Sequence, residues 1–327
     1  MKMDELKSKL GVTDSGKIYL PNEIFSDLVG CEDIASKATV TPHISFAYSY
    51  IYLCYYLYWT CKWYVTEKIT QDVMKNILGY SSNNKTLNYI IKKNGVIDQL
   101  GYTKTTTDFP MGYSYEEENI VEFETFNSYK KNPDNHALIN LLYPNERNFT
   151  IKYPTKAFHR TTKSDQDRLL DGTFYEVDYT HHVPIEVFIY CMSEKDIGVI
   201  GFYLYSFLKH KEDVSENGAM LSLNIISQET GIKATSLVEY FKVIKKHNMI
   251  DYDVKPFVFG LPTYLQIPNT YWTKEASLFG EISRNIKTRT VMSLQRYEDM
   301  YGEIEKDVSI RNEKNEMFEF AESLFPY

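Results

Sequence analysis

Two short phrases occur twice in this 327-residue chain, in the same order and at a similar spacing. LPNEIF at residues 20–25 precedes IKKNGVID at 91–98, and VPIEVF at 183–188 precedes IKKHNMID at 244–251. Both upstream phrases contain Pro, any residue, Glu, an aliphatic residue and Phe. Because an internal repeat determines the architecture of a whole chain, this pattern predicts two related structural units.

The composition is that of an ordinary globular protein, with 43% apolar and 24% charged residues. The four cysteines, Cys31, Cys54, Cys61 and Cys191, form no CxxC pair, so the sequence predicts neither a zinc site nor a disulfide framework. No basic-then-apolar signal opens the chain. These features predict a cytoplasmic protein.

The first unit has the pattern of two short helices followed by a β-wing. Residues 69–79 form an amphipathic pattern that ends at Gly79, a common helix terminator. Residues 82–95 then predict a second helix with Ser or Asn at its start. A strand at 96–104 and a returning strand at 120–126 complete the expected unit.

The second unit repeats this order. Residues 196–210 predict a buried first helix, and residues 223–231 predict a short helix that ends in Gly. Residues 233–248 follow as a longer amphipathic helix, in the place of a recognition helix. Segments 249–254 and 257–268 have the pattern of wing strands.

Residues 44–61 carry no charge, so a membrane span is one interpretation of this segment. Its length is near the lower limit for a span, and it is rich in tyrosine, which prefers membrane interfaces to the hydrocarbon centre. The favoured interpretation is a buried first helix. Its apolar residues form two stripes at helical spacing, Phe46, Tyr50, Leu53, Leu57 and Tyr64 on one and Tyr48, Tyr52, Tyr55, Trp59 and Trp63 on the other.

In a helix-turn-helix, the second helix enters the major groove of DNA, and the residues at its start meet the bases. Asn pairs with adenine, and Lys neutralises phosphates. The same residue types are also ordinary helix caps, and Lys late in a helix favours its C-terminal end. The candidate DNA contacts are Ser81, Ser82, Asn83, Asn84, Lys85, Asn88, Lys92, Lys93 and the wing residue Lys104 in the first unit, and Lys233, Thr235, Ser236, Tyr240, Lys242, Lys245 and Lys246 in the second.

The net charge of −8 excludes a protein that coats nucleic acid by bulk electrostatics, but not one with a local basic face. Acidic residues concentrate at 116–124 and 298–322, away from the two helix-turn-helix patterns. Signals for catalysis are weak: His181 and His182 are adjacent and would point to opposite faces of a strand. No nucleotide-binding or nucleophile motif is present, so we expect no enzyme activity, no metal and no cofactor.

The second unit resembles the winged-helix domains of Gram-positive plasmid and phage replication initiators and DnaD-like proteins. VPIEVF, SEKDIGVIGFYLYSFLK and LNIISQETGIKATSLVEYFKVIKKHNMID carry this resemblance, over about 70 residues. The first unit resembles them more loosely. The usual Gly-bearing exit from the recognition helix is kept at 94–97 but is replaced by HNMI at 247–250. The resemblance implies DNA binding by tandem winged helices, as in initiators that bind repeated origin sites.

The sequence therefore predicts an α+β, mostly helical fold with two winged helix-turn-helix domains in tandem. We expect the first domain at 1–160, a linker at 161–180, the second domain at 181–272 and an acidic helical segment at 273–327. The expected function is sequence-specific binding of double-stranded DNA as a replication initiator or transcriptional regulator of a plasmid or phage. A replication or transcription protein and a second copy of the chain are the further partners considered. The alternative is a protein–protein adaptor without DNA contact, which would use the aromatic helix or the acidic C-terminal segment.

Overall fold

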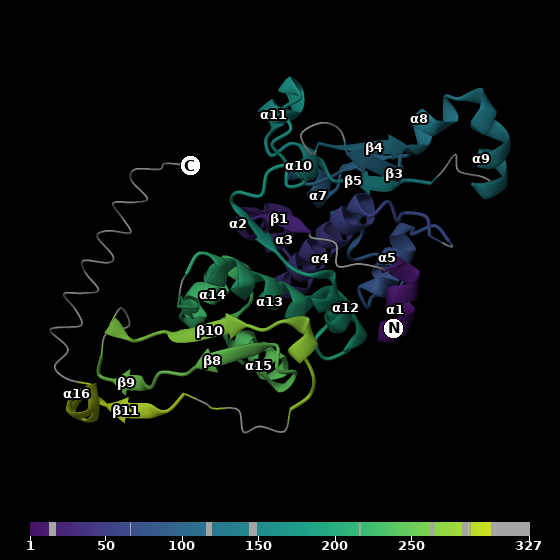
Figure 1. Ribbon diagram of the computed structural model, residues 1–327. Helices are drawn as coiled ribbons and strands as arrows, with labels where there is room; N and C mark the ends of the chain where they lie inside the picture. The colour runs from purple at the N-terminus through teal and green to yellow at the C-terminus, as the bar shows by residue number, and fades with distance from the viewer. Residues whose placement is uncertain are drawn as a thin grey trace.

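The computed structural model describes residues 1–12, 18–65, 67–115, 120–143, 149–215, 217–261, 265–282, 287 and 289–301. Over these residues the fold is α+β, with many helices and small two- or three-stranded sheets (Figure 1). Most of the acidic C-terminal run, from residue 302 onward, lies outside the described residues.

The N-terminal half contains short helices and small strand pairs around one long helix. The helices are α1 (Met3–Leu10), α2 (Ile24–Gly30), α3 (Glu32–Ala35), α4 (Val40–Trp59), α5 (Gln71–Ile77), α6 (Asn88–Ile91), α7 (Val96–Gln99), α8 (Phe126–Lys130), α9 (His136–Leu142), α10 (Thr155–Phe158) and α11 (Thr162–Asp167), with the 3-10 turn η2 (Pro133–Asn135). The strands are β1 (Tyr19–Pro21), β2 (Lys104–Thr106), β3 (Pro110–Tyr115), β4 (Val121–Thr125) and β5 (Ile151–Tyr153). β2 pairs with β5 and β3 pairs with β4, both antiparallel.

The C-terminal half begins with β6 (Thr180–His182) and continues through helices into a three-stranded sheet. The helices are α12 (Ile185–Ser193), α13 (Gly198–Asp213), α14 (Leu223–Thr230), α15 (Ala234–Lys246) and α16 (Leu294–Tyr301), with the 3-10 turn η5 (Ala276–Leu278). The strands are β7 (Ala219–Leu221), β8 (Ile250–Asp253), β9 (Phe257–Phe259), β10 (Asn269–Thr273) and β11 (Val291–Ser293). β10 lies between β7 and β8 in an antiparallel sheet, and β9 pairs with β11 in parallel.

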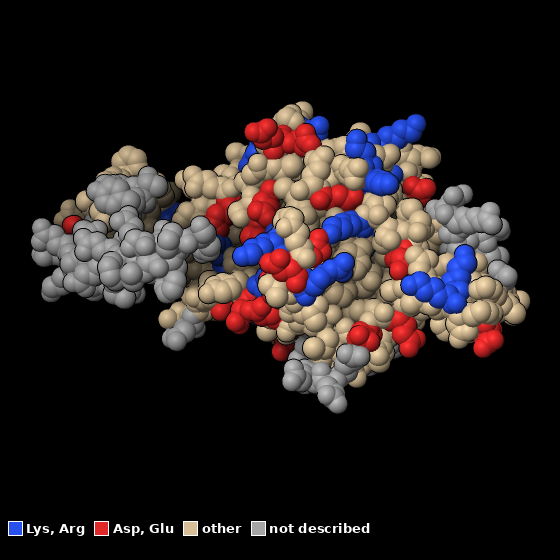
Figure 2. Space-filling model, turned by 90° about the horizontal axis from the view of Figure 1, so that it is seen from above, with Lys and Arg blue, Asp and Glu red and all other residues tan. Residues whose placement is uncertain are grey.

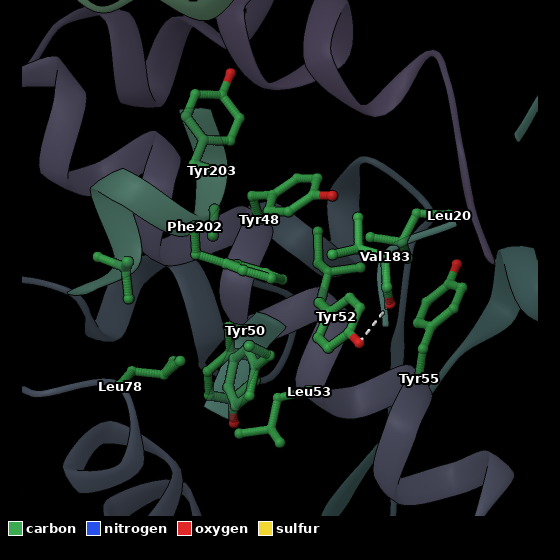
Figure 3. Packing of buried hydrophobic residues seen from close by; sticks show 14 of the residues in the cluster. Leu20, Tyr48, Tyr50, Tyr52, Leu53, Tyr55, Leu78, Val183, Phe202 and Tyr203 are labelled. Atoms are coloured by element: carbon green, nitrogen blue, oxygen red, sulfur yellow. Dashed lines mark hydrogen bonds between the residues drawn. The ribbon is translucent and has the colours of Figure 1, made fainter. Parts of the chain in front are cut away.

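Helix α4 is the centre of the molecule, as the aromatic pattern of residues 44–64 predicted. Fifteen of its twenty residues are buried. Because it is apolar all round, it packs on both sides. Tyr58 meets Phe123 of β4 and Phe158 of α10, two elements that lie above α4 in Figure 1. Tyr52 meets Phe188 of α12 and Phe202 of α13, and Figure 3 shows Tyr52 beside Phe202. The aromatic stripe is thus core rather than an exposed docking surface for an adaptor.

Helix α13 is the main partner of α4, so the two sequence units share one hydrophobic core. The Tyr48 and Tyr203 rings lie 5.3 Å apart, and the Tyr52 hydroxyl donates to the carbonyl oxygen of Val183 at 2.7 Å (Figure 3). β1 also pairs with β6 across the two units. The domain boundaries at 160, 180 and 272 stay predictions. Within the described part of the chain, no helix is both long and apolar enough to cross a membrane.

The downstream phrases of the repeat differ in conformation, although each upstream phrase leads from a strand into a helix. Residues 96–99 form the helix α7, whereas the aligned residues 249–252 lead into the strand β8. Of the recognition helix expected at 82–95, only α6 is present, so that prediction is wrong. The strand predicted over 96–104 is also wrong, except at Lys104, where β2 begins.

Candidate nucleic-acid interface

The helix pair expected in the second unit is present as α14 and α15, which pack against each other. The Ser222 hydroxyl oxygen accepts a hydrogen bond from Ile225 N at 3.2 Å and so caps the start of α14. Gly231 ends α14 at a φ of 66°, a conformation that favours glycine. Local chemistry visible in the sequence therefore positions this segment.

The wing differs from its predicted strand boundaries. β8 matches the first expected strand, but its antiparallel partner is β10 rather than the segment expected at 257–268. Thr270, Tyr271 and Trp272 belong to this return strand. β9, which falls inside the expected strand, leaves the three-stranded sheet to pair with β11.

Helix α15 presents a mixed polar face to solvent. Leu237, Phe241 and Ile244 are buried at helical spacing, which fixes the orientation of the helix. Among the candidate contacts, Lys233, Thr235 and Lys242 are exposed, and Ser236 and Tyr240 are half-buried. The start of α15 therefore presents polar side chains to solvent.

Two of the three lysines later in α15 form ion pairs within the protein. Lys242 Nζ lies 2.7 Å from Glu239 Oε1. Lys246 Nζ lies 2.8 Å from Glu281 Oε1 and 3.8 Å from Asp196 Oδ2, and the hydrogen bond with Glu281 raises the pKa of Lys246. Their charges are thus compensated locally, which lowers their capacity to attract phosphates.

Lys245 has a different environment. Its Nζ lies 3.7 Å from the centre of the Tyr252 ring and 5.6 Å from that of Phe241. Burial lowers the pKa of Lys245 to about 8. The side chain therefore covers the aromatic surface between α15 and the sheet instead of extending toward a ligand.

In the first unit, local hydrogen bonds interrupt the expected helix. Asn84 Oδ1 accepts from Thr86 N at 2.9 Å and from the Thr86 hydroxyl, and Ser81 Oγ accepts from Asn83 N at 3.2 Å. Such side-chain bonds offer the backbone an alternative to helical pairing. Ser81 and Asn84 are thus turn-forming residues, and Ser82 is half-buried beside them.

The remaining candidates of the first unit point outward and are not compensated. The side chains of Lys85, Lys92, Lys93, Asn83 and Asn88 are exposed and make no hydrogen bond or ion pair with any residue that the structure describes. Asn88 N donates to Lys85 O and Lys92 N donates to Asn88 O, so backbone hydrogen bonds hold Lys85 and Lys92 at the two ends of α6.

Lys104, expected as a wing contact, forms an ion pair with Asp165 of α11. The hydrogen bond from Lys104 holds the pKa of the Asp165 carboxyl below its usual value. This lysine is therefore tied to the protein's own surface.

Asp196, His247 and Glu281 bring three potential metal ligands within 4.8 Å of one another. His247 Nε2 lies 3.0 Å from Asp196 Oδ2, and Lys246 is ion-paired with both carboxylates. Because the lysine already supplies a positive charge there, we describe this cluster as an ion-pair network. Of the two adjacent histidines, His181 is buried and hydrogen-bonded to Tyr48.

Lys37 and His43 lie beside Tyr89, next to the candidate DNA-contact residue Asn88, although no sequence motif indicated them. Lys37 Nζ lies 4.4 Å from the centre of the Tyr89 ring, and His43 Nδ1 is hydrogen-bonded to the Tyr89 hydroxyl at 3.0 Å. Only the tertiary packing of α6 near the start of α4 brings them there, and no sequence signal would have found them.

Figure 2 shows the face above α8–α11, where lysines and arginines alternate with aspartates and glutamates. Such mixed surfaces are typical of solvated faces without a polyanionic ligand. The face seen in Figure 2 is therefore mixed in charge rather than basic.

Comparison with protein-family models, curated proteins and solved structures found no match for this chain. The functional assignment therefore depends on the chain's own residues and their geometry.

Proposed function

We propose that this protein binds double-stranded DNA through two surface segments, residues 81–93 and helix α15 with its sheet. One observation carries the proposal. Residues 73–97 contain four lysines and no acidic residue, and three of these lysines, Lys85, Lys92 and Lys93, are exposed and unpaired with any described residue. A local basic surface on an acidic protein is the expected electrostatic footprint of a DNA-binding face.

The second segment contributes through its connectivity. We infer a winged helix-turn-helix here, and the order α13, β7, α14, α15, β8, β10, with β10 between β7 and β8, supports this inference. In that arrangement the second helix, here α15, enters the major groove with its first turns. Lys233, Thr235 and Ser236 stand at those turns and would make the base and phosphate contacts.

The biological role that fits is a replication initiator or transcriptional regulator of a plasmid or phage, following the resemblance of residues 183–251. Both roles require the same DNA contacts. The position of the bound site, at an origin or at promoters, separates them.

The test is binding of purified full-length protein to selected duplex fragments, measured by fluorescence anisotropy over about 50 to about 200 mM salt. The double variant Lys92→Ala/Lys93→Ala should reduce the slope of log affinity against log salt by about two. The matched control is Lys130→Ala/Lys131→Ala, an adjacent lysine pair on the remote helix α8, which should leave the slope unchanged. Absence of duplex binding by the wild type at low salt would refute the proposal.

A second candidate, protein–protein contact, is favoured by the ribbon formed by β9 and β11. Phe259 is 73% exposed and Val291 is 74% exposed on this ribbon, while Val258, between Phe257 and Phe259 in β9, is buried. Exposed apolar residues gathered in this way mark interaction sites. Complex formation with a partner protein that is insensitive to salt and to DNA would favour this candidate.

A further inference from the structure

The two DNA-binding segments meet on the first turns of α4, residues Val40–Phe46. From the second segment, the Gly231 turn between α14 and α15 packs there. A Cβ atom added at Gly231 would lie 2.6 Å from Ile44 Cδ1 and 3.7 Å from Val40 Cγ1. Lys233 is two residues beyond this turn and is exposed.

The first segment packs on the same turns of α4. The Tyr89 hydroxyl of α6 bonds to His43, and the ring of Tyr80 meets the ring of Phe46 edge to face with centroids 5.2 Å apart. Burial, with a smaller effect of the neighbouring Tyr240 of α15, raises the pKa of Tyr80 to about 12. The first segment therefore packs on the same turns of α4 as the Gly231 turn.

We propose that Lys37, together with Lys85 and Lys233, binds DNA phosphates across residues Val40–Phe46 and joins the two segments into one continuous DNA-binding surface. Lys37 stands over the Tyr89 ring, which positions its ammonium group without neutralising it. The inference deepens the proposed function and depends on it.

The shared core makes the geometry of this surface fixed. α4 and α13 interlock through Tyr48, Tyr52 and Phe202, and the pairing of β1 with β6 closes the connection between the units. Well-packed cores do not deform continuously, so the two segments cannot adjust their separation to different half-site spacings. The surface therefore requires one uninterrupted DNA tract, in contrast to two DNA-binding domains joined by a flexible linker.

The first arm of the test measures the salt slope of the variant Lys37→Ala on the selected duplex. We expect the slope to fall by about one, equally for matched and mismatched sequences, because a phosphate contact carries no sequence information. The control is Lys163→Ala, an exposed lysine on α11, which should behave as wild type. A thermal melt confirms that each variant is folded.

The second arm inserts about five base pairs, half a helical turn, at the centre of the footprint. We expect affinity to fall to the nonspecific level and the footprint on the uninterrupted site to be one continuous tract. An unchanged slope for folded Lys37→Ala, or full affinity for the interrupted site, would overturn the inference. The proposed function fails separately, if wild-type protein binds no duplex at all or if Lys92→Ala/Lys93→Ala leaves the salt slope unchanged.

Discussion

Lys152 of β5 donates a hydrogen bond from Nζ to Asp98 Oδ1 at 2.7 Å, although 54 residues separate the two in the chain. Both side chains are buried, with 1% and 8% exposure. Asp98 also accepts hydrogen bonds from Thr103 and Asn94, so this carboxylate connects α7, the turn before it and the β2–β5 pair. The ion pair thus fixes the conformation that replaces the strand expected over 96–104.

We expect Lys152→Met to lower the free energy of unfolding by about 3 to 5 kcal/mol, because it leaves the Asp98 charge buried without its partner. The matched control is Lys104→Met, on the adjacent strand β2. It removes the exposed ion pair with Asp165 of α11 and should lower the free energy of unfolding by about 0 to 1 kcal/mol. Urea unfolding measures both. Equal losses for the two variants would contradict a special role of the buried pair.

How much of this could be read from the sequence depends on how local the cause is. The helix α14 and its Gly231 terminator follow from neighbouring residues, and their prediction is confirmed. The burial of α4 also followed, because a helix that is apolar all round needs partners on every side. In contrast, the pairing of Asp98 with Lys152 and of β1 with β6 joins distant residues that no periodicity connects.

The candidate site shows the same division. The sequence identified polar residues at the start of α15, and the structure places Lys233 and Thr235 in solvent there. It could not show that Glu281, 35 residues away, pairs with Lys246, or that Tyr252 and Phe241 surround Lys245. A lysine's availability to a ligand depends on such tertiary partners, whereas its residue type is visible in the sequence.

His210 predicts a loss of stability in acid. Its ring stacks on Phe25 and lies 5.7 Å from the ring of His181, and burial, with Lys211 as a lesser cause, lowers the pKa of His210 to about 4. The folded state therefore takes up the proton less readily than the unfolded chain. The contribution of neutral His210 to the free energy of unfolding is complete at pH values above 6.5, its ordinary pKa, and is lost as pH falls toward 4.

Between these pH values the loss amounts to about 3 kcal/mol. We expect urea unfolding of the wild type to show it, and the variant His210→Gln, which cannot be protonated, to be less sensitive to pH over the same range. Asp165 and Asp196, whose lowered pKa values also reduce stability in acid, are present in both proteins and cancel in the comparison. Parallel pH profiles for the two proteins would rule out His210 as the cause.

Gly231→Ala tests the contact between the α14–α15 turn and α4. Alanine at a φ of 66° costs about 1 to 2 kcal/mol by itself, and its Cβ would also meet Ile44 Cδ1 at 2.6 Å. We therefore expect a larger loss of unfolding free energy than strain alone gives. The added variant Ile44→Val removes the Cδ1 atom and should recover the excess, while Gly30→Ala, in open space, should have little effect. An additive double-mutant cycle would show that the contact is absent.

Lys245 and Lys246 are adjacent in sequence, and both were expected to bind phosphates, so that replacing them would weaken binding and flatten the salt slope. Their surroundings now predict different results for Lys245→Met and for Lys246→Ala. Because Lys245 contacts the Tyr252 ring, Lys245→Met should leave the salt slope of DNA binding unchanged. Lys246 is exposed and ion-paired with Glu281, so Lys246→Ala should reduce the slope only if DNA displaces that pair.

Lys245 also predicts a pH effect that is independent of DNA. Since burial lowers its pKa to about 8 from the usual 10.5, the folded protein releases this proton between those values while the unfolded chain retains it. Wild-type stability should therefore rise with pH over that range, relative to Lys245→Met, by about 1 to 2 kcal/mol after allowance for solvent screening. Chemical denaturation at pH 7.5 and at about pH 10 measures the difference. The opposite result would be a difference in unfolding free energy between wild type and Lys245→Met that does not change with pH, together with a reduced salt slope for Lys245→Met. That result would mean that the ammonium group leaves the aromatic surface and contacts DNA directly.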